Sequence, residues 1–294
     1  MSLVPALLPS LFALSLPLLG QNLPEKFRDN RAAWEENLAK GVSAPVRKAT
    51  EAVLAQDGPA VNPSDYNAMH AMVAVMSLAA RSCVLEGAWE DAVGHLQKAA
   101  RTAADNVTAA EGTFGRIRQQ HEENLKTWRG EAAKLDQRLA DLDNLGGLTS
   151  DQIKTRTQIR AQLDEFRNAI ASSERSLKEI DSLAGQLRKE QEVYAASLAE
   201  WQGFLAKEKA DIARKGSVQA YVAEKLDQVK GDDANPMPER LAYARRLQHL
   251  DPESGDCRRL VNGLMGKDEE PPAPKAKAKS APRKKHKGRT RAAA

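Results

Sequence analysis

The sequence is poor in aromatic residues and contains no segment with the composition of a β-strand. Phe, Trp and Tyr make up only 4% of its 294 residues, whereas Asp, Glu, Lys and Arg make up 29%. No run alternates apolar and polar residues with enrichment in β-branched side chains, which argues against a sheet. Ala, Glu, Lys, Leu, Gln and Arg, which suit helices, are abundant. The composition therefore predicts an elongated all-α protein.

The sequence also lacks the motifs by which catalytic and cofactor sites are usually recognised. It contains no G-x-S-x-G, no Walker-type loop and no G-x-G-x-x-G. The five histidines are scattered, without ligand spacing: His70, His95, His121, His249 and His286. We therefore predict that the protein is not an enzyme, and that it has no catalytic residue, metal ligand, cofactor or small-molecule substrate.

Cysteine is scarce, and only Cys83 and Cys257 occur. Neither belongs to a C-x-x-C motif or a Cys/His cluster, which argues against a metal site. Cys83 lies in a strongly apolar stretch, where a buried and unreactive thiol is expected. An exported protein could instead join the two cysteines in a disulfide, and the sequence leaves both outcomes open.

Positive charge is concentrated at the end of the chain. Residues 267–294 carry ten Lys or Arg and three Asp or Glu, so this segment has a net charge of +7 and the remainder −3. Nine of the positive residues follow Pro271: Lys275, Lys277, Lys279, Arg283, Lys284, Lys285, Lys287, Arg289 and Arg291. Such a segment cannot bury a core and is predicted to be disordered. Its composition resembles linker-histone tails, which implies binding to nucleic acid or to an anionic envelope polymer or lipid.

The first twenty residues read as a targeting segment. Leu3 to Leu19 is uncharged and apolar but contains three prolines, which suits the apolar region of a signal peptide better than a membrane-spanning helix. We expect a signal peptide over 1–20, cleavage near Gly20/Gln21, and a periplasmic or otherwise extracytoplasmic protein. The alternatives are an uncleaved segment that anchors the chain to a membrane and a cytoplasmic protein whose N-terminus is buried.

The strongest pattern is a repeat of apolar residues at alternating steps of three and four over 114–212. This spacing predicts two long helices folded back as an antiparallel coiled-coil hairpin. Its principal seam residues are Leu125, Trp128, Leu135, Leu142, Leu163, Phe166, Ile170, Leu177, Ile180, Leu187, Tyr194, Leu198, Trp201 and Leu205.

The hinge of this hairpin is predicted at 144–149. Gly146 and Gly147 are expected to end the first helix with positive φ, and Thr149 with Gln152 forms a capping box that starts the second. Folding at this point places residue i near residue 293 − i. His121 should then face Ser173, and Trp128 should face the Leu163/Phe166 layer.

The two arms of the hairpin differ in length, because the apolar repeat begins only at Phe114. The first arm is roughly 48 Å long and the second roughly 93 Å. The outer half of the second arm, from Tyr194 to Leu205, therefore lacks a partner within the hairpin. It must pack on the N-terminal helices or pair with a second copy of the chain as a homodimer.

Helical pairs are expected over 24–106, with helix ends at Gly41, at Asp57-Gly58-Pro59 and at Gly87, and a last helix from Trp89 to about Asn106. Within 65–106 the spacing resembles a tetratricopeptide repeat. The matching residues are Ala80, Gly87, Trp89, Ala92, Leu96 and Ala99. The family's closing proline is replaced by Ala104.

A weaker resemblance to the same family lies in a predicted C-terminal helical pair over 217–266. Its first helix would be roughly 217–229, and Leu247, Leu250 and the Asp251-Pro252 step resemble the end of a repeat's second helix. The resemblance implies that the coiled coil is inserted between repeat-like pairs, and that a concave surface binds a peptide or protein.

These observations support two functional hypotheses. The first is a non-enzymatic extracytoplasmic scaffold or adaptor that binds a protein partner through helical surfaces. The alternative is a polyanion-binding protein that acts through residues 275–291 and is dimerised by the coiled coil.

Overall fold

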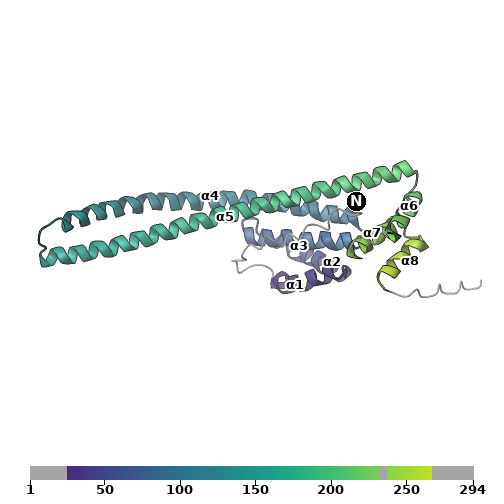
Figure 1. Ribbon diagram of the computed structural model, residues 1–294, viewed down its shortest axis with the longest axis horizontal. Helices are drawn as coiled ribbons and strands as arrows, with labels where there is room; N and C mark the ends of the chain where they lie inside the picture. The colour runs from purple at the N-terminus through teal and green to yellow at the C-terminus, as the bar shows by residue number, and fades with distance from the viewer. Residues whose placement is uncertain (1–24, 232–236, 267–294) are drawn as a thin grey trace, which may run out of the picture.

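The computed structural model describes residues 25–231 and 237–266, and every regular element in those two ranges is helical (Figure 1). The elements are α1 (Glu25–Ala39), α2 (Ala44–Gln56), the 3₁₀ turn η2 (Gly58–Ala60), α3 (Tyr66–Leu85), α4 (Trp89–Asp143), α5 (Ser150–Lys215), α6 (Val218–Lys230), α7 (Met237–Leu250) and α8 (Gly255–Leu264). The all-α class predicted from composition is thus confirmed for the described residues. The predicted signal peptide and the basic segment 267–294 lie outside them.

Helices α4 and α5 run antiparallel beside each other for most of their length and form the long axis of the molecule (Figure 1). The turn between them falls at 144–149 as predicted. The Thr149 hydroxyl accepts from the Gln152 backbone N–H, and the Gln152 side chain accepts from the Thr149 N–H at 2.8 Å, so the capping box is confirmed. The role expected of the glycines is wrong, because neither Gly146 nor Gly147 has positive φ. The helix ends at Asp143, and the loop reverses the chain without a left-handed residue.

The expected end of a helix near Asn106 is also wrong, because α4 continues unbroken from Trp89 to Asp143. Val107, Ala110 and Phe114 form one buried face against Ile180 and Leu187 of α5, and this packing keeps the segment helical. The two arms are therefore of similar length, 55 and 66 residues. At 1.5 Å per residue they span about 83 and 99 Å.

The register derived from the hinge holds along the whole hairpin. The imidazole Nδ1 of His121 lies 2.7 Å from the Ser173 hydroxyl, as predicted. The same relation, i facing 293 − i, still holds at the far end, where the rings of Trp89 and Phe204 are 5.2 Å apart. Trp128 is half-buried on the same stripe. The register of α4 against α5 is therefore nearly constant from the loop to Trp89.

Helix α3 is the centre of a bundle built against the base of the hairpin. One face packs on α4, and α1, α2 and α7 pack on the rest of its surface. Its first turn is capped by the Asp65 carboxylate, which accepts from the Asn67 and Ala68 N–H groups at 3.1 Å. By length and composition alone, Tyr66–Leu85 would be long and apolar enough to cross a membrane, but 78% of its most apolar stretch is buried within this protein. This extent of burial is typical of a helix at the centre of a protein core.

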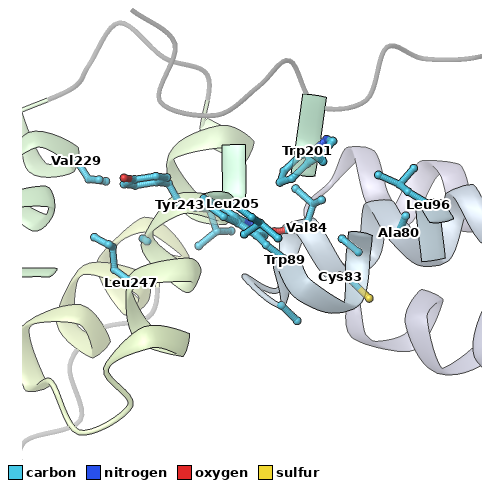
Figure 2. Packing of buried hydrophobic residues seen from close by; sticks show 14 of the residues in the cluster. Ala80, Cys83, Val84, Trp89, Leu96, Trp201, Leu205, Val229, Tyr243 and Leu247 are labelled. Carbon is cyan, nitrogen blue, oxygen red and sulfur yellow. The ribbon is translucent and has the colours of Figure 1, made fainter. Parts of the chain in front are cut away.

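The outer half of the α5 stripe is buried within the chain. Tyr194, Trp201 and Leu205 join a cluster with residues of α3, α4, α6 and α7, several of which are drawn in Figure 2. Trp201 is completely buried, and its ring meets that of Trp89 edge-on at 5.7 Å. Of the two alternatives that the sequence left open, packing on the same chain describes these side chains. The expectation that they lack a partner within the hairpin is wrong, because α4 extends back to Trp89, which contacts Trp201.

The C-terminal region contains one helix more than predicted. Helices α6 and α7 match the expected pair, but α8 follows them, starting at a Ser254 cap whose hydroxyl accepts from the Cys257 N–H at 3.3 Å. Cys257, Leu260, Val261 and Leu264 recur at i, i+3, i+4 and i+7 and pack on the core, so the sequence did carry a helical signal for α8 beyond the expected pair. Cys83 and Cys257 are both buried free thiols.

Gly87 joins α3 to α4 and touches α7. Its φ is +78°, and a Cβ atom there would lie 2.4 Å from the backbone of Arg245 and Arg246. Gly216 provides a matched control, because its φ is +79° but a Cβ atom added there would meet no atom within 4 Å. Alanine substitutions at the two sites therefore separate the cost of backbone strain from the cost of a steric clash with α7.

We expect Gly216→Ala to lower the free energy of unfolding by about 1 kcal/mol through backbone strain alone. Gly87→Ala should lower it by about 1–3 kcal/mol more, because the methyl group also displaces α7. Urea unfolding of both variants measures the difference. Equal losses would mean that α7 does not press on Gly87.

Candidate interaction groove

An open groove of about 1010 Å³ lies between the α1–α2 turn and the α7 and α8 helices. Apolar side chains and the backbone of the α1–α2 turn make up much of its wall, and Lys40, Glu86 and Arg245 are its charged residues. The lining residues are Ala39, Lys40, Gly41, Val42, Ser43, Ala44, Pro45, Glu86, Met237, Pro238, Leu241, Arg245, Gln248, Val261, Leu264 and Met265.

Arg245 fixes the position of the groove's two walls. From α7, its Nη1 donates to the Leu85 carbonyl at 2.8 Å and, at longer range, to the Ser43 hydroxyl and the Gly41 carbonyl. Within the described chain it has no carboxylate within ion-pairing distance, and burial lowers the pKa of its guanidinium. An arginine remains charged despite such a shift, so the groove holds a half-buried cation whose charge is not neutralised by direct contact.

Arg246, the next residue of α7, points to the opposite side and anchors the helix to the hairpin. Its guanidinium contacts the Glu90 carboxylate at 2.6 and 2.7 Å and Glu208 at 3.1 Å, and lies 5.0 Å from the Trp89 ring centroid. Arg246 is 1% exposed, and Glu208 is buried with it. These contacts raise the pKa of Arg246 further and hold the pKa of Glu90 below its usual range. Consecutive arginines thus hold the groove wall from both faces.

Exposed large apolar side chains gather at two places on the described surface. Val42 and Met237 are 45% and 51% exposed on the groove, and Leu145 and Ile153 are 46% and 52% exposed at the tip of the hairpin. The fifth such residue, Ile117, lies along the rod. Figure 1 shows the α4–α5 loop at one end of the molecule and α7 and α8 at the other. Large contiguous apolar patches are typical of interaction sites, whereas single exposed apolar side chains are common on any protein surface.

The residues singled out in the sequence occupy structural rather than exposed positions. Every seam residue is buried or half-buried. The residues that resemble a tetratricopeptide repeat, namely Ala80, Gly87, Trp89, Ala92, Leu96 and Ala99, are buried or half-buried near the contact of α3, α4 and α7. The nine positive residues of 275–291 lie outside the described chain.

Sequence reasoning missed the groove and a second cluster. Groove residues come from four separate parts of the sequence (39–45, 86, 237–248 and 261–265), and Arg245 and Met237 belong to no motif. Glu51, Cys83 and His95 also converge, with one potential ligand atom from each within 4.8 Å of the others. Their wide separation along the sequence matches no ligand spacing. Only the packing of α2, α3 and α4 brings them together.

Comparisons with protein-family models, curated proteins and solved structures find no match to this chain.

Removing one member of the buried Arg246–Glu208 pair should be costly, because the other charge is left buried and unpaired. We expect Arg246→Met to lower the free energy of unfolding by about 3–5 kcal/mol, and Arg245→Met, at the half-buried neighbour, to cost less. The double variant Arg246→Met/Glu208→Met should recover part of the loss. Denaturant unfolding of the three variants tests this, and a double variant less stable than Arg246→Met would contradict it.

The Glu90 contact has a defined pH dependence. Because its pKa is lowered in the folded state, its stabilisation is fully present above the ordinary carboxyl pKa and is lost as the pH falls through the lowered value. The free energy of unfolding should therefore differ less between neutral and acidic pH in Glu90→Gln than in the unmodified chain. Denaturant unfolding across that pH range measures this difference.

Proposed function

We propose that this protein is a non-enzymatic adaptor that holds a protein partner in the α1–α2/α7–α8 groove and presents the tip of the α4–α5 hairpin at a distance from it. The observation that carries the proposal is the distribution of exposed apolar side chains. Four of the five on the described surface lie at the groove or at the tip. Singly scattered residues would need no explanation, but two separated groups suggest two contact points.

The groove suits an extended peptide segment. It offers apolar contacts from Val42, Met237 and Met265, and a cation, Arg245, that lacks a carboxylate partner in the described chain. Methionine side chains adapt to varied partners because they are unbranched and polarizable. A segment with apolar residues and one carboxylate would complement these groups.

The hairpin suits the role of a rigid spacer. Beyond Phe114, which contacts Tyr66 at the start of α3, the two long helices continue to the loop for about 44 Å. Ion pairs bridge them on the outside, including Arg129–Glu174 at 2.7 Å and Arg167–Asp136 at 3.3 Å. We interpret this pairing as an antiparallel coiled coil, supported by the 3.5-residue step of the seam.

The proposal also includes repeat-like pairing of helices and an extracytoplasmic location. The α3–α4 and α6–α7 pairs are interpreted as repeat-like, supported by Gly87 and the small residues Ala80, Ala92 and Ala99 at the α3–α4 contact. An extracytoplasmic location is supported by the uncharged apolar stretch Leu3–Leu19.

Single charges placed on the apolar groups test the adaptor proposal. Val42→Glu and Met237→Glu should abolish capture of the groove partner, and Leu145→Glu and Ile153→Glu should abolish capture of a tip partner. Ile117→Glu is the matched control, since Ile117 is 41% exposed but lies in neither group. All five sites are exposed, so thermal midpoints should change little.

The measurement is quantitative mass spectrometry of proteins crosslinked to each tagged variant in the native envelope. A partner retained by Ile117→Glu but lost from a groove or tip variant supports the proposal. Identical partner profiles for all five variants would exclude both contact points.

A second candidate function rests on the nine positive residues of 275–291. A polyanion would bind them by release of counterions, with log K falling by roughly 0.9 per phosphate for each unit of log salt. We expect the full chain to associate with anionic envelope material at about 0.15 M salt, where the Debye length is about 8 Å, and the 1–266 truncation not to. Equal association of both forms would leave the helical body as the only binding surface.

A further inference from the structure

The cluster of Glu51, Cys83 and His95 joins three helices at one point. Glu51 comes from α2, Cys83 from α3 and His95 from α4, and one ligand atom from each lies within 4.8 Å of the others. A carboxylate, a thiolate and an imidazole are the three side-chain ligands that zinc takes in proteins. This cluster plays no part in the groove or the hairpin tip.

The His95 imidazole is not committed to any other contact in the described chain. Its Nδ1 is shielded from solvent and has no hydrogen-bond partner. Its Nε2 lies 3.7 Å from a Glu51 carboxylate oxygen, which is too far for a hydrogen bond. Burial lowers the pKa of this imidazole, which favours the neutral ring that can donate a lone pair to a metal ion. A ring nitrogen shielded from solvent without a hydrogen-bond partner is otherwise unfavourable.

The charge around the cluster suits a divalent cation. Arg47 contacts three carboxylates, those of Glu51 at 2.9 Å, Glu86 at 3.1 Å and Asp91 at 2.7 Å. With Lys98, whose charge also acts on His95, these groups total two positive and three negative charges. Deprotonation of Cys83 would bring the total to −2, which a divalent ion neutralises.

Arg47 does not prevent Glu51 from acting as a ligand. If Glu51 turned towards a metal ion, the guanidinium would keep Glu86 and Asp91 as partners. The Glu51 side chain is 42% exposed, so it can move, and it provides the route by which an ion enters from solvent.

We propose that Glu51, Cys83 and His95 bind a single Zn²⁺ ion that fastens α2 to α3 and α4. With Zn–S near 2.3 Å and Zn–N near 2.0 Å, the ligand atoms need to approach one another by roughly 1 Å. Coordination forms the S–Zn bond and breaks the S–H bond, whose proton goes to solvent, and no oxidation state changes. Water occupies the fourth position.

Proton loss is the main energetic cost of this site. Burial raises the pKa of the Cys83 thiol to about 12, partly opposed by the charge of Arg47. Metal binding must therefore displace a proton from a weakly acidic thiol, and affinity should rise with pH.

The test uses the full chain freed of metal and titrated with ZnCl₂ and, separately, CoCl₂. We expect one ion per chain, a higher thermal midpoint with zinc, and a near-ultraviolet thiolate-to-cobalt charge-transfer band. Cys83→Ser should abolish the band, and Cys257→Ser, the matched control at the other buried cysteine, should keep it. Absence of the band from the unmodified chain, or its survival in Cys83→Ser, would overturn the proposal.

A second comparison does not depend on folding of the Cys83 variant. His95→Gln removes a ligand and should weaken zinc binding by more than the roughly 10- to 100-fold that loss of an outer-shell partner costs, whereas His249→Gln, at an exposed histidine of α7, should leave it unchanged. Equal zinc affinity in these two variants would exclude His95 as a ligand and overturn the proposed site.

Discussion

The arrangement of the helices depends on one buried cation. Arg246 is almost completely enclosed, so its charge must be balanced within the protein. Glu90 of α4 and Glu208 of α5 supply that balance, and Trp89 covers the guanidinium. Because these partners sit on both long helices, α7 can be placed only where the base of the hairpin is closed. The opposite face of α7 forms a wall of the groove, so the contact of Arg246 with Glu90 and Glu208 also fixes the position of that wall.

The long-range pairing of α4 with α5 could be predicted because it follows from one local rule. A 3.5-residue step fixes which side chains face the partner, and the Thr149–Gln152 capping box fixes where the second helix starts. The His121–Ser173 contact follows from this arithmetic. The Trp89–Phe204 contact obeys the same relation but was not expected, because the first arm was predicted to begin only at Phe114. The bundle's helix ends were also predictable, since Asp65 and Gly87 have local signals.

The errors have a common physical cause. A helix end was expected near Asn106, but the helix continues because Val107 and Ala110 are buried against α5 residues that are distant along the chain. The groove and the Glu51–Cys83–His95 cluster were invisible for the same reason, because each is assembled from separate helices and no single stretch carries its pattern.

The constant register of the hairpin also has a consequence for how the chain folds. Pairing can begin at the 144–149 loop, where the ends are already close, and each further layer then requires little additional loop closure. The contact between Arg246 and the Gly87 carbonyl spans 159 residues along the chain and would be slow to form directly. Once Trp89 has met Phe204, however, only the stretch from Phe204 to Arg246 remains to be closed. Pairing of the two long helices thus reduces the loop to be closed for this contact from 159 residues to the stretch between Phe204 and Arg246, which favours a folding route in which the hairpin pairs before the arginine is enclosed.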